Sequence, residues 1–381
     1  MDEQLKTITT HAFAAATAVS LGSAISYPLD TIKVLIQVGS GTNKPLTTAQ
    51  ILGRVQSISG NSGLYSGLGW LTTGRIAGLG ARFGVYEILT AFYKDGREYS
   101  YVHTGEAFTA GMVAGAFESL LSSPFELVKL RAQVNSASWT PRSTVSAAAA
   151  AEKATISGLV ERLLPGNLPN MKTLNQSVNL LATLGGPKQT NMIDSVRKYP
   201  WMMTGSGRPP SITDVRSPSQ IISLEGWSSL WRGLRSGIVR DSIFGGTFFA
   251  SWEFLHRVLI TWKAVGMESP PESDEDVGPL SPIAVSLAAG VSGTVAAAAS
   301  HCFDTAKSRS QCIVLPKFLY MERKFLKWKT PGKWFERQTG IHPSDRNILF
   351  RGIWLRMARS GSMSFVVVGG YLLGIDLLLP K

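Results

Sequence analysis

The chain has 381 residues, a formal net charge of +12, 44% hydrophobic residues and two cysteines. Cys302 and Cys312 exclude a disulfide framework and a cysteine-rich metal site. The basic residues gather in particular loops, with no nucleic-acid-binding motif and no ladder of aromatic and basic residues, so the charge does not indicate a nucleic-acid-binding protein. No set of nucleophile, base and acid indicates an enzyme.

Six long segments rich in Ala, Gly, Ser and Leu are predicted to be helices, and charged loops follow them. They cover about 8–38, 68–93, 104–134, 234–262, 282–313 and 353–379. Small residues four positions apart, such as Ala14, Ala18 and Gly22, are typical of membrane helices that pack closely. No stretch of about twenty residues is free of polar groups, so hydropathy alone would leave the spans marginal. The alternative is a basic, soluble helical protein.

The connecting segments differ in composition. Short helices are predicted over about 48–59, 218–225 and 320–328. The insertion at about 135–215 lacks sustained apolar periodicity, and we predict a flexible loop with one short helix at the alanine run 147–151. An exposed acidic link is predicted over 267–279.

One charged motif occurs in three of the long helices. An acid, a base and a glutamine follow its first position by two, five and nine residues, which places them within about a turn of one another on one helix face. The copies are Pro28, Asp30, Lys33 and Gln37; Pro124, Glu126, Lys129 and Gln133; and Cys302, Asp304, Lys307 and Gln311. Pro28 and Pro124 are predicted to kink their helices. The chain therefore contains an internal repeat with three copies.

These copies resemble the signature of the mitochondrial carrier family, in which acid–glycine and aromatic–base–glycine sequences follow the motif. The matching sequences are Glu225-Gly226, Trp231-Arg232-Gly233 and Phe350-Arg351-Gly352, with a weaker Tyr65-Ser66-Gly67. The resemblance covers nearly the whole chain except the insertion. It implies an all-α membrane bundle of six transmembrane helices in three pseudo-symmetric repeats, each with a short matrix helix. The repeats would be residues 1–100, 101–265 and 266–381.

The resemblance also implies a multi-pass solute carrier of the mitochondrial inner membrane, targeted without a presequence. The basic loops would face the matrix, which places both termini on the intermembrane side. The implied partners are a small-molecule substrate and membrane lipid, with cardiolipin at the matrix helices, and the implied state is a monomer. No cofactor, metal or nucleic acid is expected. A plastid or a peroxisome is the alternative organelle.

Ionisable residues inside membrane helices are costly and are usually paired. In a pseudo-threefold bundle, the resemblance implies that each motif acid meets the base of the next repeat, so Asp30 should meet Lys129. This ring would close the cavity on the matrix side, with the three glutamines bracing it. The alternative is that the pairs only orient the helices. The outer gate is expected to be weaker, because it contains Glu87 and Glu253 but Leu372 at the third acidic position.

The substrate site is expected midway along the even-numbered helices. Positions seven and eight residues beyond each motif glycine are Gly74-Arg75, Arg240-Asp241 and Arg359-Ser360, and Arg82 lies two turns from Arg75. In the family these positions contact substrate, and an arginine–acid pair on the fourth helix resembles members that carry amino acids. Arginine can pair with a carboxylate and aspartate with an ammonium group. The alternative is that Arg240 and Asp241 pair with each other.

Three functions follow from this interpretation. The leading one is alternating-access transport of an amino acid or another carboxylate-bearing metabolite. The second is transport of a nucleotide-like or S-adenosylmethionine-like cofactor, whose aminoacyl end could use the same charged pair. The third is a degenerate carrier acting as a receptor or scaffold, which Cys302 in place of proline and the sparse outer gate favour.

Overall fold

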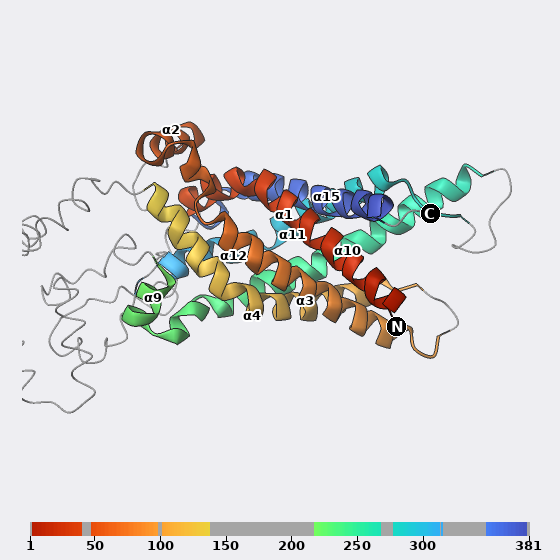
Figure 1. The fold of residues 1–381 in the computed structure, drawn as a ribbon. Helices are drawn as coiled ribbons and strands as arrows, with labels where there is room; N and C mark the ends of the chain where they lie inside the picture. The colour runs from red at the N-terminus through yellow and green to blue at the C-terminus, as the bar shows by residue number, and fades with distance from the viewer. Residues whose placement is uncertain are drawn as a thin grey trace, which may run out of the picture. The chain divides into compact units, whose positions relative to one another are not determined.

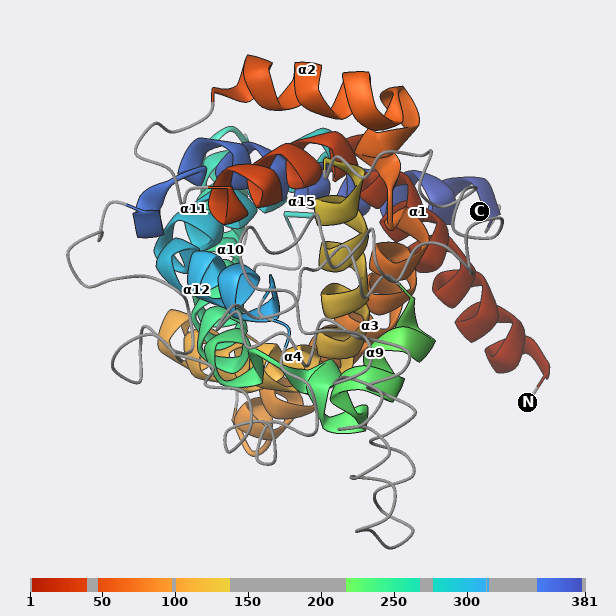
Figure 2. The ribbon, with the colours of Figure 1, turned by 90° about the vertical axis from the view of Figure 1, so that its left-hand side faces the viewer.

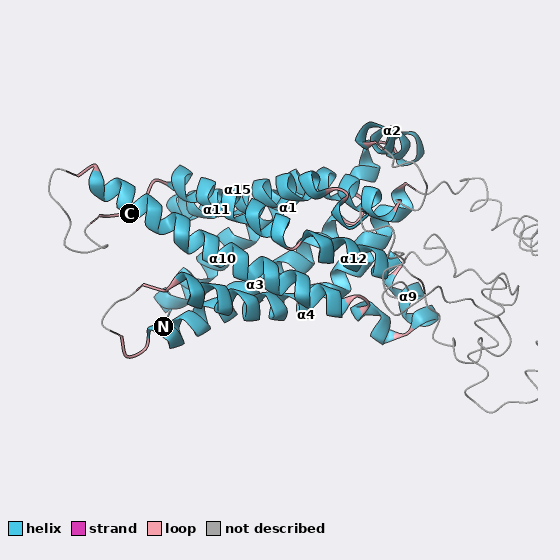
Figure 3. Ribbon diagram, turned by 180° about the vertical axis from the view of Figure 1, so that it is seen from behind, coloured by secondary structure: helices cyan, strands magenta, loops and turns pink. Residues whose placement is uncertain are grey.

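The computed structural model describes residues 2–39, 47–97, 101–137, 217–267, 277–312, 314 and 348–378. Every regular element in these ranges is a helix, which confirms the predicted all-α fold (Figure 3). The chain divides into two compact units, one of 1–137, 230–312 and 338–381 and the other of 138–229 and 313–337. The predicted helices at 147–151 and 320–328 lie outside the described residues, as do most of the insertion and most of the acidic link.

The first unit is a bundle of long helices. They are α1 (Asp2–Val38), α3 (Leu68–Lys94), α4 (Thr104–Ser136), α10 (Leu234–Val265), α11 (Pro282–Ala299) with α12 (His301–Cys312), and α15 (Ile353–Leu378). Neighbours in the order α1, α3, α4, α10, α11 and α15 pack against each other, and α15 packs against α1, so the bundle is a closed ring (Figure 2). Both chain termini lie at one end (Figure 1). We call this the terminal end, and we call the end where α1, α4 and α12 finish the motif end.

The shorter helices agree with their predicted ranges. Helix α2 (Thr48–Ser59) is an amphipathic segment of the first unit, and Ile51 and Val55 are its buried face. In the second unit, α9 (Pro218–Glu225) is capped at its N-terminus by Ser217, whose hydroxyl accepts a hydrogen bond from the backbone amide of Gln220. The short 3-10 segments are η1 (Asn61–Tyr65) and η4 (Trp227–Trp231).

The fifth span differs from its prediction. The sequence predicts one helix over about 282–313, but the structure interrupts it at Ser300, between α11 and α12. The Ser300 hydroxyl donates to the Ala296 carbonyl at 2.8 Å and accepts from Arg356 Nη2 at 2.7 Å. A serine bonded back to the preceding turn competes with the helical ladder and bends helices. The repeat with Cys302 in place of proline therefore still has an interruption of the helix, two residues earlier.

Three glycines begin the helices that carry the predicted substrate positions. Gly67, Gly233 and Gly352 precede α3, α10 and α15 with φ angles of 89°, 80° and 81°. L residues rarely adopt this left-handed region, whereas glycine does so without steric cost. These glycines, the last residues of the three aromatic–base–glycine sequences, therefore set the start and the register of α3, α10 and α15, which are the second, fourth and sixth spans.

The bundle buries charge and exposes apolar side chains. Lys33, Asp304 and Lys307 are at most 3% exposed, whereas Phe92 and Trp262 are 74% and 80% exposed. Three described helical segments, 7–38, 282–299 and 348–378, are long and apolar enough to cross a membrane. On α3, α4 and α10, the charged residues Arg82, Glu118, Lys129 and Asp241 are buried. This inverted arrangement suits a helix bundle surrounded by lipid.

Helices α4 and α10 are in backbone contact. A Cβ atom at Gly111 would collide with the Gly245 carbonyl, and one at Gly115 would collide with the carbonyl of Asp241. Small residues allow this close approach of helices. Because the contact lies at Asp241 itself, it fixes the height and rotation of the Arg240–Asp241 position relative to α4.

Candidate functional site

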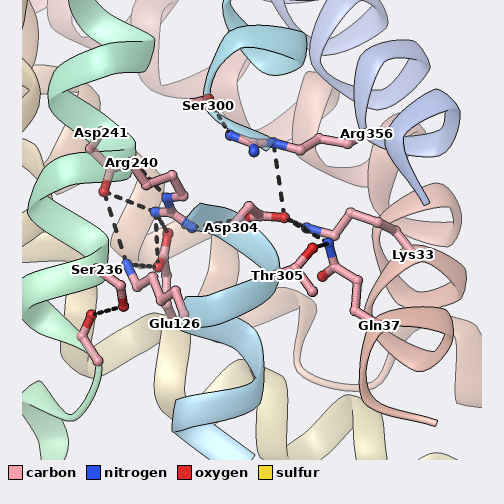
Figure 4. Close-up of polar contacts among 12 residues, drawn as sticks. Lys33, Gln37, Glu126, Ser236, Arg240, Asp241, Ser300, Asp304, Thr305 and Arg356 are labelled. Carbon is pink, nitrogen blue, oxygen red and sulfur yellow. Dashed lines mark hydrogen bonds and ion pairs between the residues drawn. The ribbon is translucent and has the colours of Figure 1, made fainter. Parts of the chain in front are cut away.

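Six motif residues form three ion pairs inside the motif end of the bundle. Each pair joins the acid of one repeat to the base of the next, as the pseudo-threefold interpretation requires. The pairs are Asp30–Lys129 at 2.7 Å, Glu126–Lys307, and Asp304–Lys33 at 2.9 Å, the last of which Figure 4 shows. We call these six residues the ring. Their side chains are 0% to 15% exposed, and buried charges of this kind require partners to be tolerated.

Two glutamines brace the ring. Gln37 Nε2 donates to Asp304 Oδ2 and to Thr305 Oγ1, both at 3.1 Å. Gln133 makes the equivalent bonds to Asp30 Oδ2 and Thr31 Oγ1, also at 3.1 Å. In both cases the amide ties an ion-paired acid to the threonine that follows it.

The third glutamine is different. Gln311 is 2% exposed, and its Nε2 atom has no hydrogen-bond partner among the described residues. The repeated geometry would direct this amide toward Glu126 and the next residue, but that residue is Leu127, which has no hydroxyl. The junction between the second and third repeats is therefore held without the amide brace that the other two junctions have.

Arginines of α10 and α15 lie against the ring acids and form a second layer of charge. Arg359 Nη1 is 3.1 Å from Asp30 Oδ1, and Arg356 Nε is 3.9 Å from Asp304 Oδ2. Arg240 contacts two ring acids, with Nη2 2.9 Å from Glu126 Oε1 and Nη1 3.1 Å from Asp304 Oδ1. Each ring acid thus contacts at least one arginine as well as a lysine.

Arg240 and Asp241 also pair with each other, which is one of the two arrangements that the sequence left open. Arg240 Nε lies 2.8 Å from Asp241 Oδ1, and Nη2 lies 2.9 Å from Oδ2. This bidentate contact is the strong form of an arginine–carboxylate pair. Lys307 Nζ is 3.9 Å from the same carboxylate. In this conformation both members of the pair are occupied within the protein.

A further charged cluster lies on α3 and α4. Arg82 pairs with Glu118, and its guanidinium lies 4.9 Å from the centre of the Phe244 ring. Arg75 lies on the same face of α3 and has no hydrogen bond or ion pair with any described residue. Gly74 does not face the cavity, because a Cβ there would lie 2.6 Å from Phe125 Cβ. The predicted position 74 therefore contributes helix packing rather than a cavity surface.

The clusters line one cavity between α3, α4, α10, α12 and α15. Its charged lining residues are Arg75, Arg82, Arg240, Arg356 and Arg359, with Glu118, Glu126, Asp241 and Asp304. The buried Asp30 and the three ring lysines lie beneath them. Eight bases against five acids leave an excess of three positive charges in this described network, so an anion or an anionic group is the complementary ligand.

Two residues of this network were missed by the sequence reasoning. Glu118 is a carboxylate in an otherwise apolar part of the third predicted helix, and an ionisable residue there is a signal of function. Arg356 lies three residues before Arg359, hence on the same helix face. Both could have been found by examining every charged residue in the spans rather than the repeated positions alone.

The terminal end contains the predicted outer-gate residues in unequal settings. The Tyr86 hydroxyl donates to Glu253 Oε1 at 3.2 Å, and the Tyr86 ring stacks on Phe249 with 3.6 Å between ring centroids. Glu87 is exposed, and its carboxylate makes no ion pair with the part of the chain described. In the third repeat, Tyr371 pairs with His11 Nδ1 at 2.9 Å.

Comparison with known proteins agrees with the repeated motif. The family model described as mitochondrial carrier protein matches residues 4–97 and 100–174. The mitochondrial brown fat uncoupling protein 1 of Bos taurus is 30% identical over 178 residues, which are 44% of this chain and 56% of the relative. The mitochondrial arginine transporter BAC2 of Arabidopsis thaliana is 26% identical over 265 residues, 61% of this chain and 86% of the relative.

The chain spans about half the length of the uncoupling-protein relatives that it matches, from 42% to 56% of three of them. The arginine transporter is matched over most of its length. The family match, the three motif copies and the closed helix ring that brings those copies together all agree. In these stretches the chain is similar to the mitochondrial carrier family.

Proposed function

We propose that this protein is a solute carrier of the mitochondrial inner membrane that moves a carboxylate-bearing metabolite by alternating access. One observation carries the proposal: arginines that line the cavity are ion-paired to acids of the ring beneath it. Arg240 contacts Glu126 and Asp304, and Arg359 contacts Asp30. Ligand recognition and closure of the motif end therefore use the same side chains.

This sharing gives a mechanism for coupling. A substrate carboxylate that binds Arg240 or Arg359 competes with the ring acids for the guanidinium donors. Each such charge-assisted hydrogen bond contributes about 1.5–3 kcal/mol, so the substrate offsets part of the cost of separating the ring. A ligand shifts a conformational equilibrium only by its differential affinity for the two states. Here the difference in affinity arises because the arginines become available to the substrate when the ring acids separate from them.

An amino acid is the substrate class we favour. A zwitterion can insert between Arg240 and Asp241, with its carboxylate on the arginine and its ammonium group on the aspartate, and so replace both halves of the internal pair. The Arabidopsis relative is named as an arginine transporter. A nucleotide-like or S-adenosylmethionine-like cofactor is the second candidate. Among such cofactors, the excess positive charge of the cavity network favours those that carry a phosphate.

The test is uptake by the purified protein in liposomes that contain cardiolipin. The panel consists of labelled amino acids, the matching deaminated carboxylates, and nucleotides. We expect saturable uptake of at least one carboxylate, reduced about tenfold or more in an Arg240→Ala variant, since 1.4 kcal/mol corresponds to a factor of ten. Uptake of nucleotides alone would favour the second candidate. Correctly inserted protein that takes up none of these solutes would favour a scaffold role.

We also propose lipid as a partner and a monomer as the working state. The outward faces of the spans carry exposed apolar side chains, such as Phe92, Trp262 and Leu377, which require a lipid environment. Cardiolipin at the matrix helices is an expectation from the family resemblance. The yield of active carrier reconstituted with and without cardiolipin would test it.

A further inference from the structure

The Arg82–Glu118 pair lies in the cavity lining but apart from the ring. Arg82 comes from α3 and Glu118 from α4, and their side chains are 5% and 6% exposed. Phe244 lies against the guanidinium. Arg82 Nε has no hydrogen-bond partner within the described residues. The ion pair with Glu118 nevertheless neutralises the charge of Arg82, so in this state Arg82 is not a separate anion site.

Holding α3 to α4 does not require this pair. Close packing of Gly74 against Phe125 already joins the two helices. At the terminal end, Arg97 makes two bonds to Glu106, at 3.0 and 2.5 Å. A buried ion pair is weak evidence for stability, because the desolvation of two charges offsets much of their attraction. A role in the cavity is therefore the better account of Glu118.

The position of Arg75 indicates what that role is. Arg75, Gly78 and Arg82 are spaced by three and four residues, so they share one face of α3. A Cβ at Gly78 would lie 3.0 Å from Glu118 Cγ, so the glycine makes room for the carboxylate between the two arginines. Of these two cations, Arg82 is paired, while Arg75 pairs with no described residue.

We propose that Glu118 is a specificity-determining residue. By occupying Arg82, it leaves Arg75 as the single anion site on α3, and its own charge repels a second carboxylate at that height of the cavity. The site then accepts solutes that present one carboxylate to α3 and discriminates against dianions. Specificity commonly depends on such a repulsive element as well as on attraction. This inference rests on the proposed transport of a carboxylate-bearing solute.

The test compares two probes of nearly equal shape, succinate as the dianion and succinamate as the monoanion. Affinity is measured from the rise in unfolding temperature of the purified protein in detergent as each probe is added, since a ligand of the folded state raises it. For Glu118→Gln, we expect the ratio of succinate to succinamate affinity to rise about tenfold or more, the effect of one charge-assisted hydrogen bond.

Two further variants isolate the cause. Glu106→Gln, on the same helix, removes the acid of the Arg97–Glu106 pair outside the cavity and should keep the wild-type ratio. Arg82→Gln combined with Glu118→Gln removes the released cation as well, so the ratio should fall back toward the wild-type value and keep only the smaller gain that comes from the lost repulsion of Glu118. If Glu118→Gln does not fold, Glu118→Asp supplies the measurement, because the shorter acid withdraws from Arg82 and a smaller rise is expected.

The proposal is overturned if folded Glu118→Gln has the wild-type ratio or binds neither probe. It is also overturned if the double variant keeps the whole gain, because the released Arg82 would then contribute nothing to it. Failure of the proposed function has a different signature, namely no uptake of any carboxylate by the wild-type protein in liposomes. The ratio of the two probe affinities in detergent does not depend on transport.

Discussion

The two ends of the bundle are held by different kinds of contact. The motif end has three buried ion pairs, two glutamine braces and a layer of arginines. The terminal end has a stacked aromatic pair, Tyr86 and Phe249, and hydrogen bonds from Tyr86 to Glu253 and between His11 and Tyr371, while its Arg97–Glu106 ion pair is partly exposed. One end depends on buried charge complementarity, and the other depends on aromatic packing, single hydrogen bonds and an ion pair open to solvent.

Because of this difference, we expect the two ends to respond differently to mutation. Removing one partner of a buried ion pair leaves an uncompensated charge and costs about 3–5 kcal/mol. Removing a neutral hydrogen bond costs about 0.5–1.5 kcal/mol. We therefore expect the motif end to require substrate in order to open, and the terminal end to open at a smaller cost.

The largest effect is expected for Lys33→Asp. Lys33 Nζ lies 2.9 Å from Asp304 and 3.5 Å from Asp30. The substitution would place a third carboxylate beside these two buried acids, at a cost of several kcal/mol. We expect no measurable uptake in liposomes while the protein still inserts into the membrane. Activity near the wild-type level would contradict a role of the ring in transport.

A charge swap tests the pairing itself. Asp30→Lys combined with Lys129→Asp reverses the 2.7 Å pair and should recover part of the activity that either single change removes. Recovery should be incomplete, because Arg359 also lies 3.1 Å from Asp30 and would face the new lysine. If the double variant is no more active than the single ones, this pair does not act as a unit in the transport cycle.

The next largest effects concern Arg240 and Asp241. Arg240→Ala should reduce substrate affinity about tenfold to a hundredfold, the equivalent of one charge-assisted hydrogen bond. Asp241→Asn keeps the shape and removes the charge, and it should lower the preference for amino-bearing solutes over their deaminated partners. Competitive uptake with matched pairs measures this preference. An equal loss for both solutes would mean that Asp241 only positions Arg240 through their 2.8 and 2.9 Å contacts.

The sequence predicts what depends on spacing along the chain. The starts of α3, α4 and α10 at Leu68, Thr104 and Leu234 agree with prediction, because caps and glycine turns are local signals. The ring is predictable because three equivalent helices bring equivalent positions together. The break at Ser300 is not predicted, because a single serine in an apolar segment does not by itself indicate one, and the Arg356 side chain that it contacts lies 56 residues away in the chain.

Properties that depend on helix rotation and on competition between partners were not predictable. Gly74 and Arg75 are adjacent in sequence, yet Gly74 packs against Phe125 while Arg75 lines the cavity. The sequence left open whether Arg240 pairs with Asp241, and the same arginine is also within 3.1 Å of Asp304. Distances between residues so far apart in the chain follow from packing, which no local pattern records.

A smaller effect should separate the three junctions of the ring. Gln37→Ala removes two hydrogen bonds and should lower the unfolding temperature in detergent, because two such bonds together contribute about 1–3 kcal/mol. Gln311→Ala, the matched control, removes an amide with no described acceptor for its Nε2 donor and should change stability less. Equal destabilisation by the two variants would contradict the unequal bracing. Leu127→Thr supplies the absent hydroxyl, so in that background Gln311→Ala should lower the unfolding temperature more than it does in the wild type.

The smallest effect is expected at the terminal end, for Tyr86→Phe. This change removes the 3.2 Å hydrogen bond to Glu253 and keeps the ring stacked on Phe249. The expected loss of stability is about 0.5–1.5 kcal/mol, the contribution of a typical hydrogen bond, and uptake should continue. Tyr86→Ala is the matched comparison, because it also removes the aromatic contact and should lower the unfolding temperature further, as loss of a large buried aromatic side chain costs about 3–5 kcal/mol. Both are measured by thermal unfolding in detergent and by uptake into liposomes. If Tyr86→Phe abolished uptake as completely as Lys33→Asp, the terminal end would depend on a single polar contact as strongly as the motif end depends on its ion pairs, and the proposed asymmetry would be wrong.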